Sequence, residues 1–109
     1  MKTTKIYAGI CVALLSFFNA PSFGQYPNKP IRLVVPFAAG GTVDTVARII
    51  APDLGENLGQ SVVIEYKAGA ATIVGADFVA KSAPDGYSLL MGTATTFSVN
   101  PILYKKLPY

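Results

Sequence analysis

Small and hydroxyl-bearing residues recur in three segments of this chain, each directly after a short apolar run. The segments are Phe37-Ala38-Ala39-Gly40-Gly41, Gly69 to Gly75, and Thr93-Ala94-Thr95-Thr96. Glycines ahead of a helix let a ligand approach the backbone, and the first N–H groups of a helix have no partner within it. With the helix dipole, they favour a carboxylate or a phosphate. Threonine hydroxyls donate to such an anion without adding charge.

Each of these features also has a purely structural interpretation. Gly40-Gly41 is equally compatible with a tight strand-to-helix turn that binds nothing, and Thr is common at strand ends for local reasons. Asp44 falls in the first turn of a predicted helix, where it would complement the dipole and cap free N–H groups. The alternative is a direct contact with a ligand hydroxyl or amine. A catalytic role is not expected, because no second acid or base accompanies Asp44 in a loop.

Several kinds of chemistry are excluded from residues 25–109, which contain no Cys and no His. Disulfides, thiolate metal sites, Cys nucleophiles and His general bases cannot form there, and no metal or organic cofactor is expected. The phosphate-binding pattern GxxxxGK[ST] is absent, and Gly40-Gly41 lacks the third glycine of a dinucleotide fingerprint.

The elements that must position the three segments follow from the spacing of apolar residues. Short apolar runs predict strands at 31–35, 62–66 and 87–91, with a turn at Pro84-Asp85-Gly86 before the last. Helical spacing predicts helices at 43–58, 73–82 and, shortened or bent by Pro101, 97–104. Pro52 is expected to kink or break the first helix and Gly59 to end it. The packed face of that helix is predicted to hold Val43, Val46, Ala47, Ile50, Leu54 and Leu58.

The resulting order is β-α-β-α-β-α, with strands too apolar for one wet face. This predicts a parallel sheet covered on both sides by helices. All three segments then follow the carboxyl ends of strands, the edge at which such sheets bind ligands.

Residues 1–24 have the features of a secretory signal peptide cleaved before Gln25. Lys2 and Lys5 precede an apolar run, and Ser22 and Gly24 supply the small residues of the cut site. An uncleaved anchor helix is the alternative. Without the two leader lysines, seven basic residues face six acidic ones. The formal charge of +3 thus belongs largely to the leader, and no basic patch for nucleic acid remains.

Three stretches of the sequence strongly resemble receptors of tripartite tricarboxylate transporters, the Bug family. They are KPIRLVVPF-x-x-GG-x-x-D at 29–44, APDGYSLLMG at 83–92 and NP-x-LYKKLPY at 100–109. The resemblance covers about residues 26–109. It implies an α/β, periplasmic binding protein-like (type II) parallel-sheet lobe, of which 25–109 would be an incomplete N-terminal segment with the second domain missing. It also implies a periplasmic protein that binds a small carboxylate and delivers it to the membrane components of a transporter.

The resemblance implies three ligand-binding loops. By position they are Phe37, Ala38, Ala39, Gly40, Gly41 and Asp44; then Gly69, Ala70, Ala71, Thr72 and Gly75; then Thr93, Ala94 and Thr95. The second loop departs from the family's usual pattern, close to RPGAGGNIGA, because Ala71 and Thr72 stand where glycines are usual. Two other hypotheses stay open: a truncated gene relic that binds no ligand, and an α/β enzyme, which the missing His and Cys disfavour.

Overall fold

Three parallel strands form the centre of the fold. The computed structural model describes residues 24–109, so the predicted signal peptide lies outside the described residues except for Gly24. The strands are β1 (Ile31–Val35), β2 (Val62–Tyr66) and β3 (Ser88–Leu90), in the order β2-β1-β3. Leu33 of β1 stands opposite Ile64 of β2 and Leu89 of β3. All three predicted strands are confirmed. The third is shorter than predicted, although hydrogen bonds from Arg32 N–H to Tyr87 and from Met91 N–H to Val34 extend its pairing at both ends.

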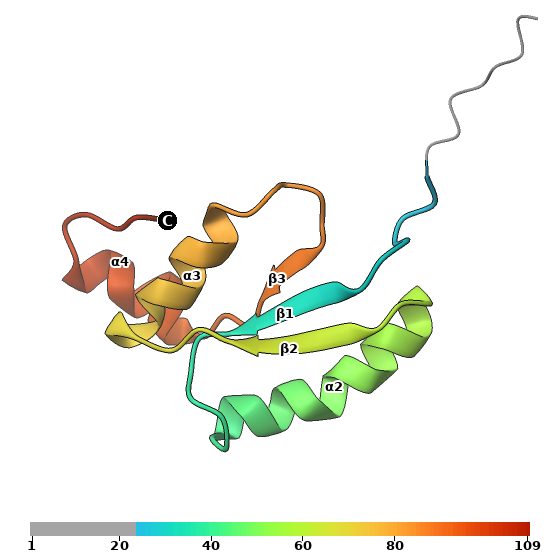
Figure 1. Ribbon diagram of the computed structural model, residues 1–109. Coiled ribbons are helices and arrows are strands. Elements are labelled where there is room, and N and C mark those ends of the chain that lie inside the picture. The colour runs from blue at the N-terminus through green and yellow to red at the C-terminus, as the bar shows by residue number, and fades with distance from the viewer. Residues whose placement is uncertain (1–23) are drawn as a thin grey trace, which may run out of the picture.

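The central strand supplies most of the core. Ile31, Val34 and Val35 are fully buried and Leu33 is nearly so, as a β-branched run between two neighbouring strands should be. Helices lie on both faces of the sheet, α2 (Thr42–Leu58) on one and α3 (Ile73–Ala80) on the other (Figure 1). The cover is incomplete on β2, where Val63 is 53% exposed.

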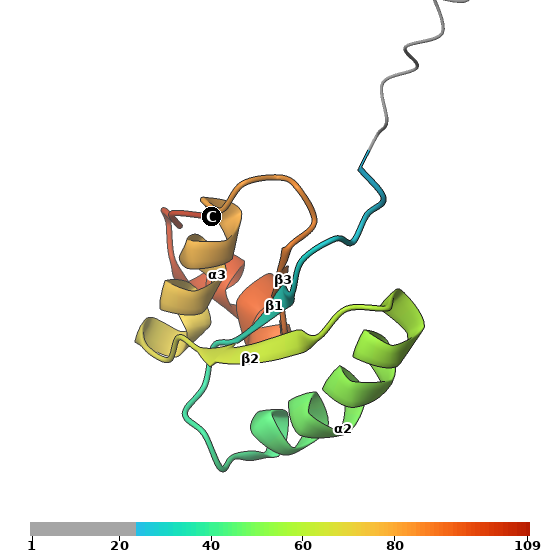
Figure 2. The same ribbon diagram turned by 45° about the vertical axis from the view of Figure 1, so that its right-hand side comes forward.

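Helix α2 runs without interruption through Pro52 and ends at Gly59, whose positive φ of 68° forms the expected helix stop. The predicted early break at Pro52 is therefore wrong, whereas the alternative, a kink, stays a prediction. The helix is continuous although proline removes one of its hydrogen bonds, and it packs against β1 and β2 (Figure 2).

The predicted packed face of α2 is correct only in part. Ala47 and Ala51 are buried against Leu33 and Val35, whereas Val46 and Ile50 are 45% and 39% exposed. Because their side chains are small, the two alanines allow α2 to approach the sheet closely, and the helix–sheet contact is centred on them. Since α2 lies under β1 and β2, its side toward β3 is left uncovered.

The remaining elements are short. A 3₁₀ turn, η1 (Ala70–Thr72), precedes α3, and a π-helical turn, η2 (Thr95–Val99), leads into α4 (Asn100–Leu103). The predicted short helix near Pro101 is confirmed. The predicted loop over Thr93 to Thr96 is wrong in extent, because the Phe97 N–H already bonds the Thr93 carbonyl at 3.2 Å and the helical turn includes Thr95 and Thr96.

Candidate functional site

The three predicted binding loops meet at one edge of the sheet, since they follow the carboxyl ends of three parallel strands. The first loop joins β1 to α2, the second joins β2 to η1, and the third joins β3 to η2 (Figure 1). Side-chain hydrogen bonds tie the first loop to the end of β2, and tie the second loop to η2 and α4.

The first loop is exposed from Ala38 to Gly41. Gly40 has a φ of +91°, and no heavy atom lies within 4 Å of the Cβ that a side chain would add there. Gly41 is the N-cap of α2 with an ordinary φ of −87°, and an added Cβ would meet only the Ala38 carbonyl at 3.8 Å. Among the described residues, no side chain caps the first turn of α2. The leading amides of this helix are thus available to an anion.

Asp44, in the first turn of α2, is buried, with 3% of its surface exposed. Its Oδ2 accepts the Gly40 N–H at 2.7 Å, and its Oδ1 accepts the Tyr66 hydroxyl at 2.7 Å and Arg48 Nε at 2.9 Å. The expectation that Asp44 caps helix N–H groups is wrong, because its carboxylate turns back to the loop amide instead.

The hydrogen bonds around Asp44 also set its protonation. The Tyr66 hydroxyl, then the Gly40 amide and Arg48, hold the pKa of Asp44 below its ordinary value, against the opposing effect of burial. The bond to Asp44, and then burial, raise the pKa of Tyr66 against the opposing effect of Arg48. The contact with Asp44 also raises the pKa of Arg48. The carboxylate is therefore charged at neutral pH, and its charge is satisfied inside the protein.

Sequence reasoning missed Arg48 and Tyr66. The spacing of Asp44 and Arg48, one helical turn apart, is a recognisable ion-pair signal. For Tyr66 no local signal existed, because its contact with Asp44 spans 22 residues.

The second loop holds three successive non-glycine residues in the left-handed region, Ala70, Ala71 and Thr72, with φ of 44°, 51° and 75°. Such conformations cost on the order of 1 kcal/mol each for residues with a Cβ. Gly75 lies behind this loop, where a Cβ would approach within 2.7 Å of Pro36 Cβ. Gly75 thus permits close packing of α3 on the end of β1.

A polar cluster joins the second loop to the helical turn after the third. It consists of the buried Thr72, Thr96 and Asn100 and the half-buried Tyr109. The Thr72 and Thr96 hydroxyls are 2.9 Å apart, and Asn100 Nδ2 donates to the Ala71 carbonyl at 2.8 Å. The Tyr109 hydroxyl donates to the Thr96 carbonyl at 2.7 Å. Thr72 is only 2% exposed, so its hydroxyl serves the fold in this arrangement.

In the third loop, Ala94 is exposed while Thr93 and Thr95 are half-buried. Thr93 Oγ1 and Asn100 Oδ1 are buried without a hydrogen-bond partner among residues 24–109. A mostly apolar pocket of about 230 Å³ separates this loop from the first turns of α2, and is lined by Thr42, Val43, Val46, Met91, Gly92 and Thr93.

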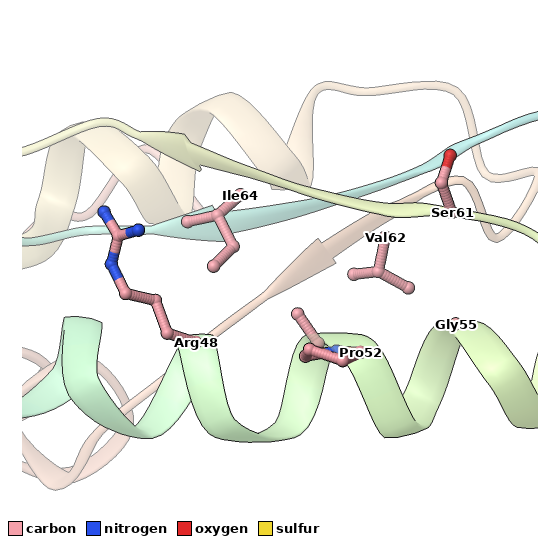
Figure 3. A pocket seen from close by; sticks show the side chains of 7 residues that line it. Arg48, Pro52, Gly55, Ser61, Val62 and Ile64 are labelled. Carbon is pink, nitrogen blue, oxygen red and sulfur yellow. The ribbon is translucent and has the colours of Figure 1, made fainter.

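A larger groove, of about 560 Å³, is lined by none of the predicted binding residues (Figure 3). It runs between α2 and β2, where Val62 and Ile64 project from the strand toward Arg48 and Pro52 of the helix. Its apolar lining marks it as the open side of the helix–sheet contact.

Residues 24–109 contain neither a metal site nor a membrane-spanning helix. Within that range no group of three or more acidic, Cys or His residues is placed to hold a metal ion. No helix there is both long enough and apolar enough to cross a membrane.

Comparison with known proteins gives a consistent family match. Residues 46–109 match the model described as "Tripartite tricarboxylate transporter family receptor". Two curated relatives from Bordetella pertussis are similar along most of the chain. One, described as a UPF0065 protein, is 45% identical over 90% of this chain. The other, protein BugT, is 39% identical over the whole of this chain. The chain spans 30% and 34% of the length of these two relatives.

Solved structures are similar in fold as well as in sequence. One, described as a periplasmic transporter, is 46% identical with a TM-score of 0.74 over 77% of this chain and 28% of its own. Two from Rhodopseudomonas palustris have TM-scores of 0.73: Rpa4515 with adipate, 40% identical, and MatC with bound malate, 42% identical. They cover 78% and 77% of this chain and 28% and 29% of their own. The predicted α/β fold class, part of a periplasmic binding protein, is confirmed.

Proposed function

Because the chain belongs to the family of tripartite tricarboxylate transporter receptors, we propose that it binds a small carboxylate at the carboxyl edge of its sheet. The family consists of non-enzymatic periplasmic binding receptors. The family prediction and the prediction that the chain is not an enzyme are therefore confirmed, and the α/β enzyme hypothesis is wrong.

The observation that carries the proposal is the likeness to two structures described with malate and with adipate, at 42% and 40% identity. Both ligands are small dicarboxylates, and we propose a ligand of the same class for this chain. The uncapped first turn of α2 supplies amide donors for a carboxylate, each charge there gaining about 0.3–1 kcal/mol when exposed. Neither the first nor the third loop contains Lys or Arg, so binding depends on backbone and hydroxyl donors.

The predicted contact residues divide into two roles under this proposal. Residues 37–41 lead into the α2 amides, and residues 93–95 begin with Thr93, which lines the small apolar pocket. That pocket would accept a methylene segment of the ligand. Asp44, Thr72 and Gly75 hold the loops in place, because their polar atoms or packing surfaces are used within the protein. Gly69, Ala70 and Ala71 shape the second loop.

We further propose that the chain is exported to the periplasm and works with the membrane components of such a transporter. The support is the family and the periplasmic description of similar structures.

Isothermal titration of the purified chain tests the binding proposal. The panel is malate, adipate and citrate, with glucose as an uncharged control. Binding of at least one carboxylate, but not of glucose, is expected. Binding of glucose alone would contradict the proposal, and absence of binding to every ligand would favour a fold that keeps the family pattern without its function.

A further inference from the structure

The Asp44 carboxylate, in the first turn of α2, connects the first loop to the end of β2. Oδ2 holds the Gly40 amide of the first loop, and Oδ1 receives the hydroxyl of Tyr66, the last residue of β2. The carboxylate is buried, and both of its oxygens are occupied by protein donors. This geometry indicates that Asp44 shapes the loop rather than contacts a ligand.

Of the two side chains that donate to Oδ1, only that of Tyr66 comes from the sheet. Arg48 sits one turn along the same helix as Asp44, so their ion pair leaves the helix free to shift relative to the strands. Tyr66 belongs to β2, where it is in register with Val35, and the next residue donates its N–H to the Val35 carbonyl at 2.9 Å. Its hydroxyl is thus anchored by the sheet.

The Tyr66 hydroxyl is well matched to this position. It donates to Asp44 and accepts from Arg48 Nη2 at 2.7 Å, so its hydrogen-bonding capacity is used in both directions. The ring packs against the core of Leu33, Val35, Ala47 and Ala51. Removing only the oxygen would leave that packing in place.

We infer that Tyr66 is a positioning residue for the first loop. It holds this loop through Asp44, so that the free amides at the start of α2 face the ligand. The inference rests on the proposed carboxylate function. A residue at the end of one strand would in this way set the backbone geometry of the loop after the neighbouring strand.

The variant Tyr66→Phe tests this inference, with Tyr87→Phe as its matched control. Tyr87 also loses hydroxyl hydrogen bonds when changed, but to Asn28, in the segment that leads into β1 and away from the binding loops. Two quantities are measured in each: the exchange rate of the Gly40 amide by NMR and the Kd for malate.

Tyr66→Phe removes the hydroxyl bonds to Asp44 and from Arg48, of which only the first reaches Gly40. We expect Gly40 exchange to become several-fold faster and malate affinity to fall by about five- to tenfold, the size of the lost bond to Asp44. Tyr87→Phe should leave both quantities at wild-type values. Equal changes in the two variants would point to a general loss of stability and overturn the inference, as would no change in Tyr66→Phe.

A third variant, Arg48→Gln, separates the strand link from the ion pair. A larger effect on Gly40 in Arg48→Gln than in Tyr66→Phe would assign the role to Arg48 and overturn the inference. If wild-type protein binds no carboxylate, the proposed function fails, while the Gly40 exchange rates still decide whether Tyr66 positions the loop.

Discussion

At the scale of single residues, Asp44 makes folding stability depend on pH. Its pKa in the folded protein lies below the ordinary 3.8, chiefly because of the Tyr66 hydroxyl and the Gly40 amide. A carboxyl with a lowered pKa contributes stability above its unfolded pKa, and that contribution is lost as pH falls through the folded value.

We therefore expect stability to fall from about pH 4 downward, and to fall less steeply in Asp44→Asn. Urea unfolding at a series of pH values from about 7 to about 3 measures this. The matched control is Asp85→Asn, which removes a carboxyl whose pKa is lowered mainly by the Tyr87 amide at the opposite edge. An unchanged slope in Asp44→Asn would contradict the assigned hydrogen bonds.

At Gly41, the effect of a substitution on ligand affinity can be distinguished from its effect on folding stability. It is the N-cap of α2, has an ordinary φ, and has room for a Cβ. Serine is preferred over glycine at this position because its hydroxyl caps the N–H groups that open the helix. Those are the groups proposed to hold the ligand.

Gly41→Ser should therefore raise stability by a few tenths of a kcal/mol while lowering carboxylate affinity, because the serine oxygen competes for the same amides. Thermal unfolding and titration calorimetry give the two readouts. Gly41→Ala is the control that adds a Cβ without a cap. Wild-type affinity in both variants would remove Gly41 from the proposed site.

At the scale of elements, the sequence was most informative where burial and periodicity agree. The run Ile31–Val35 is buried almost throughout, so its strand was predictable from apolar, β-branched composition alone. Helix α2 was predictable in extent, but its packed face depends on which strands lie above it. That arrangement left Val46 and Ile50 exposed.

The loops were predictable in place and not in internal contacts. Parallel strands require the three loops to share an edge, which the β-α order already indicated. Individual hydrogen bonds in the cluster of Thr72, Thr96, Asn100 and Tyr109 join residues that are far apart in sequence. The longest of them, from Asn100 to the Ala71 carbonyl, spans 29 positions. Contacts of that range leave no periodic trace in a sequence.

The second loop carries a prediction of its own. Ala71 has a φ of +51°, a region that glycine reaches without steric cost. Ala71→Gly should therefore stabilise the protein by about 0.5–1 kcal/mol, the reverse of the usual effect of glycine. Urea unfolding measures it. Ala80→Gly, at the end of α3, is the control expected to lose stability, and a loss in both variants would contradict the left-handed geometry of Ala71.

At the scale of the whole molecule, the proposed export can be tested at the N-terminus. Lys2, Lys5 and the apolar run after them predict removal of residues 1–24. Mass spectrometry of the protein recovered from the periplasm should find Gln25 at the N-terminus. A product that retains Met1 in the cytoplasm would contradict the periplasmic assignment.

A small carboxylate is proposed to bind where the three loops meet. A titration of ¹⁵N-labelled protein with malate, followed by amide chemical shifts, tests this most directly. Saturable shifts are predicted for the amides of residues 40–44 and 93–95, with none along the groove between α2 and β2. No saturable shift, or shifts centred on that groove, would contradict the claim.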